Sequence, residues 1–576
     1  MRFKTTCFAV LFAASSLCAQ PAPTISYETS AVHPLLVQFE ADRGSLSRFY
    51  VIENSPERRE RFKKLRTDYL AQLQALPFEQ MNTDSRVDYL LFQRNLRNDL
   101  AKLEQEEREM QQIQPWFPFA GTLYTLEKER RRGKVLDARQ VAADLTALSA
   151  QVEAAHRQVE KLGPIDPAIA RRANRTAVGL KTALESVFNF YNEYDPQFTW
   201  WVPQPFQRAD SLLSNYAALF GRRAKRSSGA KTDSSGIVGT AVGRDELVRQ
   251  LQYELIPYSP DELIQIANRE FAWCDRELLK ASREMGFGDN WKAAQEKVKN
   301  SYVAPGHQPE LILRLYNESI DFLKKNDLIT IPPVAEETWR MSMMSPERQR
   351  VNPFFLGGEE IIISYPTGSM SEADKLMSMR GNNPHFSRST VHHELIAGHH
   401  LEFFMNNRYK TYRNFDTPFW VEGWSLYWEM LLWDKGFPQS PEDRIGMLFW
   451  RMHRCARIIF SLNYHLGQWS PQQCIDFLVD RVGFERANAE GEVRRSFVGG
   501  YPPLYQLAYM TGGFQFYALQ KELVGSGKLT NKQFHDTIMR MNALPVEMIR
   551  AILIGQPLRR DFKTNWRFYP LDGAKK

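Results

Sequence analysis

Apolar residues recur at helical spacing in the first third of this 576-residue chain. Two such stripes are Leu65, Tyr69, Leu73 and Leu76, and Val141, Leu145, Leu148 and Val152. Steps of three and four residues place one apolar face on an α-helix. The clearest strand pattern is the run 359–365, which Pro366 ends, and strands and helices do not alternate along the sequence. We therefore predict a mainly α, large multi-helix fold with a small β-sheet.

A segment rich in Ser, Gly and basic residues, 222–244, divides the chain. Its composition is typical of a flexible linker or loop. Helical patterning is clear again at Ser259-Pro260-Asp261-Glu262, a typical helix start with Ser before Pro and acids in the first turn. We expect an N-terminal helical region over 20–221 and a second, catalytic helical region over 245–576.

The first 19 residues have the pattern of a signal peptide. Basic Arg2 and Lys4 precede an apolar stretch that is too short to span a membrane, and small residues follow it. Cys18 raises the alternative of a lipid anchor, but Leu17 fits poorly where such a site needs a small residue. We expect an exported, periplasmic protein without a membrane span.

The charge balance of the chain limits the kinds of molecule that we expect it to bind. The chain has 74 basic and 67 acidic residues, a net charge of +7, and contains no long Lys/Arg run. This balance does not indicate a nucleic-acid partner. An apolar content of 43% is ample for a buried core. The oligomeric state is not indicated by these features.

Four of the eleven histidines lie within nine residues, at His392, His393, His399 and His400. Glu394 directly follows His393. A His-Glu pair followed by another His is typical of zinc hydrolases, because imidazoles bind the metal and the neighbouring Glu accepts a proton from water. We therefore expect one Zn²⁺ ion here, with Glu394 as the general base.

The spacing of these histidines does not fit a regular helix. The usual H-E-x-x-H pattern would need His at position 397, which is Ala397. On a regular helix His399 lies about 240° around from His393, and His400 lies about 10 Å along the axis. We therefore predict that the helix is interrupted between Glu394 and His399, and Gly398 permits such a break.

A third ligand is expected from the aromatic helix at 419–429. Glu422 lies 23 residues after His399, and Glu429 follows seven residues later on the same face. A carboxylate buried among Trp side chains is costly unless it is paired or bound to a metal. We expect His393, His399 and Glu422 to hold the zinc. The alternatives are Glu429 as the ligand, or pairing of these acids with Arg408 or Arg451.

These blocks resemble the bacterial domain-of-unknown-function family 885 (DUF885), a family related to zinc-dependent peptidases. Segment 393–400 is similar to its H-E-x-x-P-G-H-H, 422–427 to its E-G-W-A-L-Y, and 495–512 to its R-Y…P-x-Q-A-x-x-Y-x-x-G. Ala397 departs from the Pro of the family. The resemblance implies a zincin-like metallopeptidase fold, one family domain over 21–576, and His399 rather than His400 as the ligand.

The third block supplies candidates for substrate contacts. A peptide hydrolase needs a donor for the oxyanion formed at the attacked carbonyl, and Tyr509, which matches the family block, is the expected catalytic donor. Tyr501 and Tyr505 are expected to bind substrate; the alternative is that Tyr505 and Tyr509 only pack a helix face. Arg494 and Arg495 are candidates to bind a substrate carboxylate.

Two further alternatives remain open for these elements. The arginines of the third block could instead pair with Glu490 or Glu492. The strand at 359–365 could pair with an extended peptide, or be purely structural.

The sequence therefore predicts an exported zinc-dependent peptidase that acts on a peptide substrate. Two alternatives belong to other classes of protein. One is a catalytically inactive helical binding protein that retains the motif. The other is a non-haem iron enzyme, which also uses two His and one carboxylate, although Glu394 beside His393 would then have no role.

Overall fold

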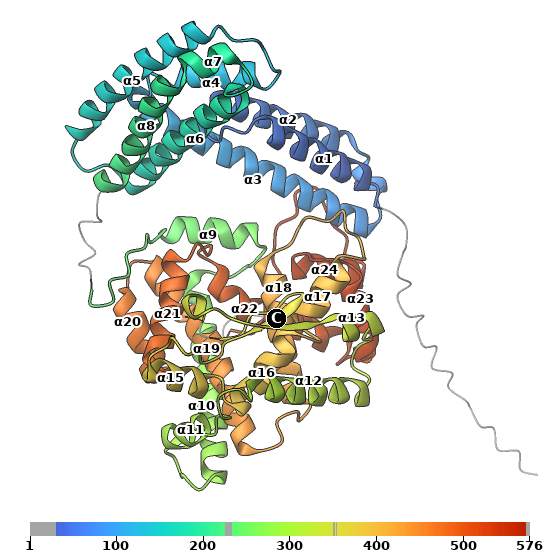
Figure 1. Cartoon of the computed structure of the whole chain (residues 1–576). Helices are drawn as coiled ribbons and strands as arrows, with labels where there is room; N and C mark the ends of the chain where they lie inside the picture. The colour runs from blue at the N-terminus through green and yellow to red at the C-terminus, as the bar shows by residue number, and fades with distance from the viewer. Residues whose placement is uncertain (1–29, 225–232, 350–351, 353, 572–576) are drawn as a thin grey trace, which may run out of the picture.

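Helices form nearly all regular structure in the computed structural model, which describes residues 30–224, 233–349, 352 and 354–571. Within these residues there is one sheet, with two strands (Figure 1). The prediction of a mainly α fold with a small sheet is confirmed. The predicted signal peptide, residues 1–19, lies outside the described residues. None of the described helices combines the length and the apolar character needed to cross a membrane.

The first three helices belong to two packing units. They are α1 (His33–Phe49), α2 (Pro56–Ala75) and α3 (Thr83–Ile113). Buried side chains of α1, α2 and the first part of α3 share a core with residues from the C-terminal half, whereas Ile113 lies in a separate core. A buried ion pair, Arg413 Nε to Asp88 Oδ1 at 2.8 Å, joins α3 to the C-terminal half. The region 20–221 is thus divided along α3.

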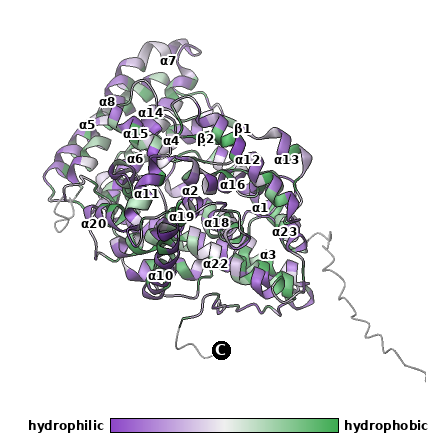
Figure 2. Ribbon diagram, turned by 90° about the horizontal axis from the view of Figure 1, so that it is seen from below, coloured by the Kyte–Doolittle hydropathy of each residue, from purple (hydrophilic) through white to green (hydrophobic). Residues whose placement is uncertain are grey.

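The separate core belongs to the helices that follow α3, drawn at the top of Figure 1. They are α4 (Ala120–Arg130), α5 (Ala138–Glu160), α6 (Pro167–Tyr191), α7 (Pro196–Trp201) and α8 (Pro203–Arg223). Several of these helices carry both hydrophilic and hydrophobic residues along their length (Figure 2). The stripe at 141–152 predicts that their apolar faces pack against each other. This is confirmed, since the four residues of the stripe are all buried in this core: Val141, Leu145, Leu148 and Val152.

Only part of the predicted linker 222–244 lies between the N-terminal helices and the C-terminal body. Helix α8 ends at Arg223 and α9 begins at Arg244. Residues 225–232 lie outside the described part, but 233–243 pack along the C-terminal body. Ile237 is buried there, and the backbone N–H of Gly243 donates to the carbonyl of His465. This stretch therefore belongs to the C-terminal body.

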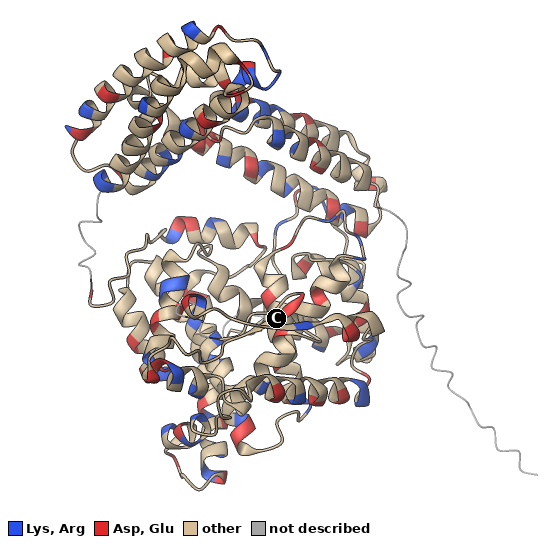
Figure 3. Ribbon diagram, in the orientation of Figure 1, with Lys and Arg blue, Asp and Glu red and all other residues tan. Residues whose placement is uncertain are grey.

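The C-terminal body contains the remaining helices and the sheet. Its first helices are α9 (Arg244–Tyr253), α10 (Pro260–Glu284), α11 (Trp291–Lys299), α12 (Gln308–Lys325), α13 (Pro333–Thr338), α14 (Pro346–Gln349) and α15 (Glu372–Gly381). They are followed by α16 (Pro384–Glu394), α17 (His399–Asn406), α18 (Pro418–Asp434), α19 (Pro441–His465), α20 (Pro471–Phe477), α21 (Arg486–Val498), α22 (Tyr505–Leu523), α23 (Asn531–Met539) and α24 (Val546–Ile554). Basic and acidic residues are interspersed over both bodies (Figure 3).

The predicted strand is present over a shorter range. Strand β2 (Glu360–Ile363) pairs in parallel with β1 (Arg340–Met343), with Arg340 opposite Glu360. On the other edge of β2, Leu356 exchanges both backbone hydrogen bonds with Ile362. Chain segments of the protein itself thus lie on both sides of β2, so an extended peptide would have to displace one of them to pair with this strand.

Helices α18 and α22 approach each other most closely where two glycines meet. A Cβ atom on Gly423 would lie 2.6 Å from the Cα of Gly512, and one on Gly512 would lie 2.0 Å from the carbonyl oxygen of Phe419. Real Cβ atoms do not approach backbone this closely, so both positions need glycine. The contact brings together the acids of α18 and the tyrosines of α22.

We expect Gly423→Ala to lower the free energy of unfolding by about 1–3 kcal/mol, since the added methyl group must push α18 and α22 apart. Gly121→Ala in α4 is the matched control. A Cβ there meets nothing within 4 Å, and Ala favours a helix by about 1 kcal/mol over Gly. Urea denaturation followed by tryptophan fluorescence measures both effects. Equal stability of the two variants would contradict this account of the helix contact.

Candidate functional site

The histidine cluster lies at a break between two helices. Helix α16 ends at Glu394 and α17 begins at His399, so the predicted interruption is confirmed. Between them the backbone folds back, and the N–H of Gly398 donates to the carbonyl of His392. A Cβ at Gly398 would lie 1.9 Å from the carbonyl oxygen of His393. Only glycine fits this turn, which directs His393 and His399 to the same place.

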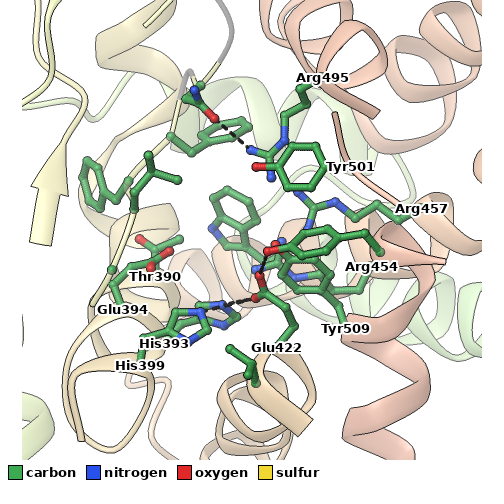
Figure 4. A pocket seen from close by; sticks show the side chains of 18 of the residues that line it. Thr390, His393, Glu394, His399, Glu422, Arg454, Arg457, Arg495, Tyr501 and Tyr509 are labelled. Atoms are coloured by element: carbon green, nitrogen blue, oxygen red, sulfur yellow. Dashed lines mark hydrogen bonds and ion pairs between the residues drawn. The ribbon is translucent and has the colours of Figure 1, made fainter. Parts of the chain in front are cut away.

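Both imidazoles face one carboxylate of α18. The Nε2 atom of His399 lies 3.3 Å from Oε2 of Glu422, and that of His393 lies 3.6 Å from the same oxygen. One ligand atom from each residue lies within 4.8 Å of the other two, and all three side chains are buried. The structure thus brings together the three residues predicted as metal ligands (Figure 4).

A second carboxylate lies behind each imidazole. Nδ1 of His393 is 2.8 Å from Oε1 of Glu429, and Nδ1 of His399 is 3.1 Å from Oε2 of Glu402. Metal-binding histidines usually bond such a partner through the nitrogen that does not hold the metal, which fixes the tautomer and the ring orientation. Glu429 therefore lies in the position of such a partner, at the nitrogen of His393 that does not face Glu422. Glu402 was not predicted from the sequence, although it lies three residues after His399 on one helix.

The alternative partners proposed for these acids are not found. Arg408 donates to the carbonyl of Phe404, and Arg451 donates to Glu270. Arg454, which the sequence analysis did not consider, donates to Glu429 at 3.1 Å. Burial opposes ionisation of Glu429, but the charge of Arg454 and the hydrogen bond to His393 lower its pKa to about 2.

The environment of Glu422 fits a cation. Burial would raise its pKa, yet the charge of His399 and the facing ring of His393 hold it well below the usual range. The hydroxyl of Tyr505 donates to Oε1. Oε2, which faces the imidazoles, is buried and has no hydrogen-bond partner in the described part of the chain. Two imidazole nitrogens and one such carboxylate oxygen are a donor set that zinc accepts.

The other two histidines of the cluster point elsewhere. Both ring nitrogens of His400 are bonded to backbone carbonyls, Nδ1 to Gly358 at 3.2 Å and Nε2 to Ala335 at 2.9 Å. Nδ1 of His392 is bonded to the carbonyl of Arg388, and its ring meets Phe437 edge-on. Burial lowers the pKa of His392 to about 4. These contacts favour His399 over His400 as the second ligand.

The cluster opens into a cavity of about 360 Å³. Glu394, at the end of α16, lines it and is 9% exposed. Burial raises the pKa of Glu394, while the charges of His393 and His399 act in the opposite direction. Segment 354–357, which leads into β2, forms another part of the wall. The small sheet is thus connected to the cavity by this segment.

The three predicted tyrosines all line the cavity, from α22 and the turn before it. The ring of Tyr509 stacks on that of His393, with centroids 6.1 Å apart and an interplanar angle of 12°. The rings of Tyr501 and Tyr505 lie 4.4 Å apart. Tyr505 and Tyr509 therefore do more than pack a helix face.

The arginines of the third block divide between two places. Arg495 lines the cavity, and its Nε lies 3.6 Å from Oε2 of Glu492. The acidic neighbour named in the alternative, Glu492, is therefore present, while binding of a substrate carboxylate by Arg495 stays a prediction. Arg494 instead donates to the carbonyl of Ser235 at 3.4 Å. Arg454 and Arg457 also line the cavity but were not predicted from the sequence. The available signal was their three-residue spacing, which places both on one face of a helix.

Comparison with known proteins places the chain in a family. The sequence pattern of the family described as "Bacterial protein of unknown function (DUF885)" matches residues 51–553. The curated proteins contain no sequence that matches this chain.

Two solved structures have a similar fold. One is a candidate lipoprotein of unknown function from Shewanella oneidensis, with a TM-score of 0.65 and 16% identity over 91% of this chain and 100% of that one. The other is a candidate lipoprotein from Colwellia psychrerythraea, with a TM-score of 0.54 and 14% identity over 91% and 98% of the two chains. At these identities the likeness concerns the fold. Because the family pattern covers most of its length, the chain belongs to the DUF885 family.

Proposed function

We propose that this protein is an exported, zinc-dependent peptidase with a zincin-like fold. The observation that carries the proposal is the convergence of His393 and His399 on one buried oxygen of Glu422, which accepts no hydrogen bond from the described residues. A carboxylate oxygen in this position costs several kcal/mol unless a cation or donor meets it. The carboxylates behind both imidazoles support a metal rather than a structural ion pair.

Zinc bound by these residues would supply a Lewis acid that polarises a carbonyl and lowers the pKa of a water ligand to about 7. Glu394 faces the same cavity, so it can take a proton from the attacking water and deliver it to the leaving amine nitrogen. Burial raises the pKa of Tyr509, which keeps its hydroxyl protonated at neutral pH. It can therefore donate a hydrogen bond to the oxygen of the attacked carbonyl.

The structure refines the role proposed for Tyr505. Its hydroxyl donates to Glu422, so the side chain fixes the orientation of that carboxylate. The ring of Tyr501 covers that of Tyr505 and lines the cavity beside Arg495. Tyr501 is therefore the better candidate of the two for direct contact with substrate.

Export rests on the pattern of the first 19 residues, a basic start, a short apolar stretch and small residues before Gln20. The description of the two structural relatives as candidate lipoproteins supports a location outside the cytoplasm. We propose cleavage of the signal and a periplasmic location. Lipid attachment at Cys18 is the alternative.

We expect purified protein to contain one zinc ion per chain and to cleave peptides, with activity lost on treatment with a chelator and restored by zinc. Elemental analysis and mass spectrometry of a digested peptide mixture measure these properties. Bound iron with oxygen-dependent turnover would instead identify a non-haem iron enzyme. A metal-free protein that binds peptides without cleaving them would identify an inactive binding protein.

A further inference from the structure

Three arginines line one side of the cavity, next to Tyr501 and Tyr509 and away from Glu394 (Figure 4). They are Arg454 and Arg457 of α19 and Arg495 of α21. Their side chains are only 4%, 4% and 9% exposed. Buried guanidinium groups are rare, because their charge must be compensated by an opposite charge or by hydrogen bonds.

Two carboxylates form ion pairs with these guanidinium groups in the described part of the chain, and Glu422 also lies close enough to Arg457 for their charges to interact. Arg457 and Arg495 share one acid, Glu492, through a hydrogen bond of 2.6 Å from Arg457 Nε and a longer contact of 3.6 Å from Arg495 Nε. Arg454 shares Glu429 with His393. Each of the two ion-paired carboxylates is thus shared, Glu492 between Arg457 and Arg495 and Glu429 between Arg454 and His393.

Some N–H groups of these three arginines also have no hydrogen-bond acceptor in the described part of the chain. Within the described residues, Nη1 of Arg457 and Nε of Arg495 are buried without a hydrogen bond. The further contact of Arg495, to Oδ1 of Asn352, is long at 3.5 Å. Burial lowers the pKa of the neighbouring His453 to about 3, so this histidine is neutral. Because all three arginines line the cavity, it has positive charge and guanidinium groups that suit an anionic group of a ligand.

The distance to the metal site limits where that group lies in the substrate. The ring of Tyr509 stacks on His393 on one side, and the guanidinium of Arg457 lies 4.2 Å from the ring centroid. The arginine and the imidazole thus contact the same ring, which places the guanidinium no more than about 10 Å from the imidazole. One peptide residue spans about 3.3–3.6 Å, so an anion held here lies within about three residues of the bond that is attacked.

We propose that Arg457 and Arg495 bind the C-terminal carboxylate of the peptide, so that the enzyme is a carboxypeptidase that releases a short C-terminal segment. This inference rests on the proposed peptidase function. In the reaction, the hydroxyl of water bonds to the acyl carbon, the C–N bond breaks, and the proton goes to the leaving nitrogen. A cavity of about 360 Å³ accommodates such a short C-terminal segment.

The test compares one peptide in two forms, with a free C-terminal carboxylate and with a C-terminal amide. A third peptide, an amide with Glu as its last residue, distinguishes the terminal carboxylate from an acidic side chain. We expect kcat/KM for the free acid to exceed that for both amides by about 10–100-fold, as expected for a hydrogen bond between charged groups. Equal cleavage of acid and amide would overturn the inference and leave the peptidase proposal intact.

The variant to test is Arg495→Gln, because Arg457 holds the fully buried Glu492 and its loss endangers folding. We expect Arg495→Gln to lower kcat/KM for the free acid by about 10–100-fold, mainly through KM, with little effect on the amides. Arg495→Lys should restore part of the loss. Arg494→Gln, next in sequence but bonded to a backbone carbonyl, is the control and should change neither value.

A binding measurement separates this inference from the question of activity. Glu394→Gln protein is titrated calorimetrically with the free acid and with the amide. Tighter binding of the free acid, weakened by Arg495→Gln, supports the carboxylate site even in a protein that cleaves no peptide. Equal affinity for the two forms would overturn the inference, whatever the activity of the native protein.

Discussion

His399→Ala is expected to abolish zinc binding. The variant loses one of the three converging ligand atoms and leaves Glu402, which orients the imidazole, without its partner. Loss of an outer partner alone costs about 10–100-fold in metal affinity, and loss of a ligand itself should exceed the upper end of that range. Elemental analysis after dialysis, and competition with a chromophoric chelator, measure the zinc content and the affinity.

The adjacent residue provides a matched control. His400→Ala removes an imidazole of the same size from the same helix, but its nitrogens lie against the carbonyls of Ala335 and Gly358 and not against Glu422. We expect this variant to be less stable by about 1–3 kcal/mol, because at least one buried carbonyl loses its donor, and still to bind zinc. If His400→Ala loses the metal and His399→Ala keeps it, the ligand assignment is wrong.

The local part of this site could be predicted from the sequence. The six-residue spacing of His393 and His399 is incompatible with a regular helix, and Gly398 marks the place where the chain can turn back. These facts concern neighbours along the chain, so spacing and backbone conformation suffice to derive them. The mainly helical fold followed from the same kind of periodicity.

The two acids of α18 show where prediction from spacing stops. Seven residues are about two helical turns, so Glu422 and Glu429 lie on one face, as expected. Spacing does not tell which of them is the ligand. In the structure His393 lies between them, with Nε2 toward Glu422 and Nδ1 toward Glu429. Their roles differ because the ring has two nitrogens that point in opposite directions.

The remaining parts depend on contacts between distant segments. Arg454 and Arg457 reach the cavity because α19 packs beside α16 and α22, and neither their partners nor their burial follows from the sequence of α19 alone. The division of α3 between two cores has the same origin. Its helical pattern is continuous, whereas the elements that cover its two ends come from different parts of the chain.

Glu394→Gln is expected to lower peptide turnover by at least about 10²-fold while the protein keeps its zinc. The change preserves the shape of the side chain, and none of the three residues that converge on the metal site is altered. It removes only the carboxylate that can carry a proton from water to the leaving amine. Single-turnover rates, zinc content and the melting temperature are measured on one preparation.

Glu359→Gln, at an exposed surface position, is the control and should keep full activity. An active, zinc-loaded Glu394→Gln protein would show that Glu394 is not the base. Loss of zinc from this variant would instead assign the carboxylate to the metal site itself.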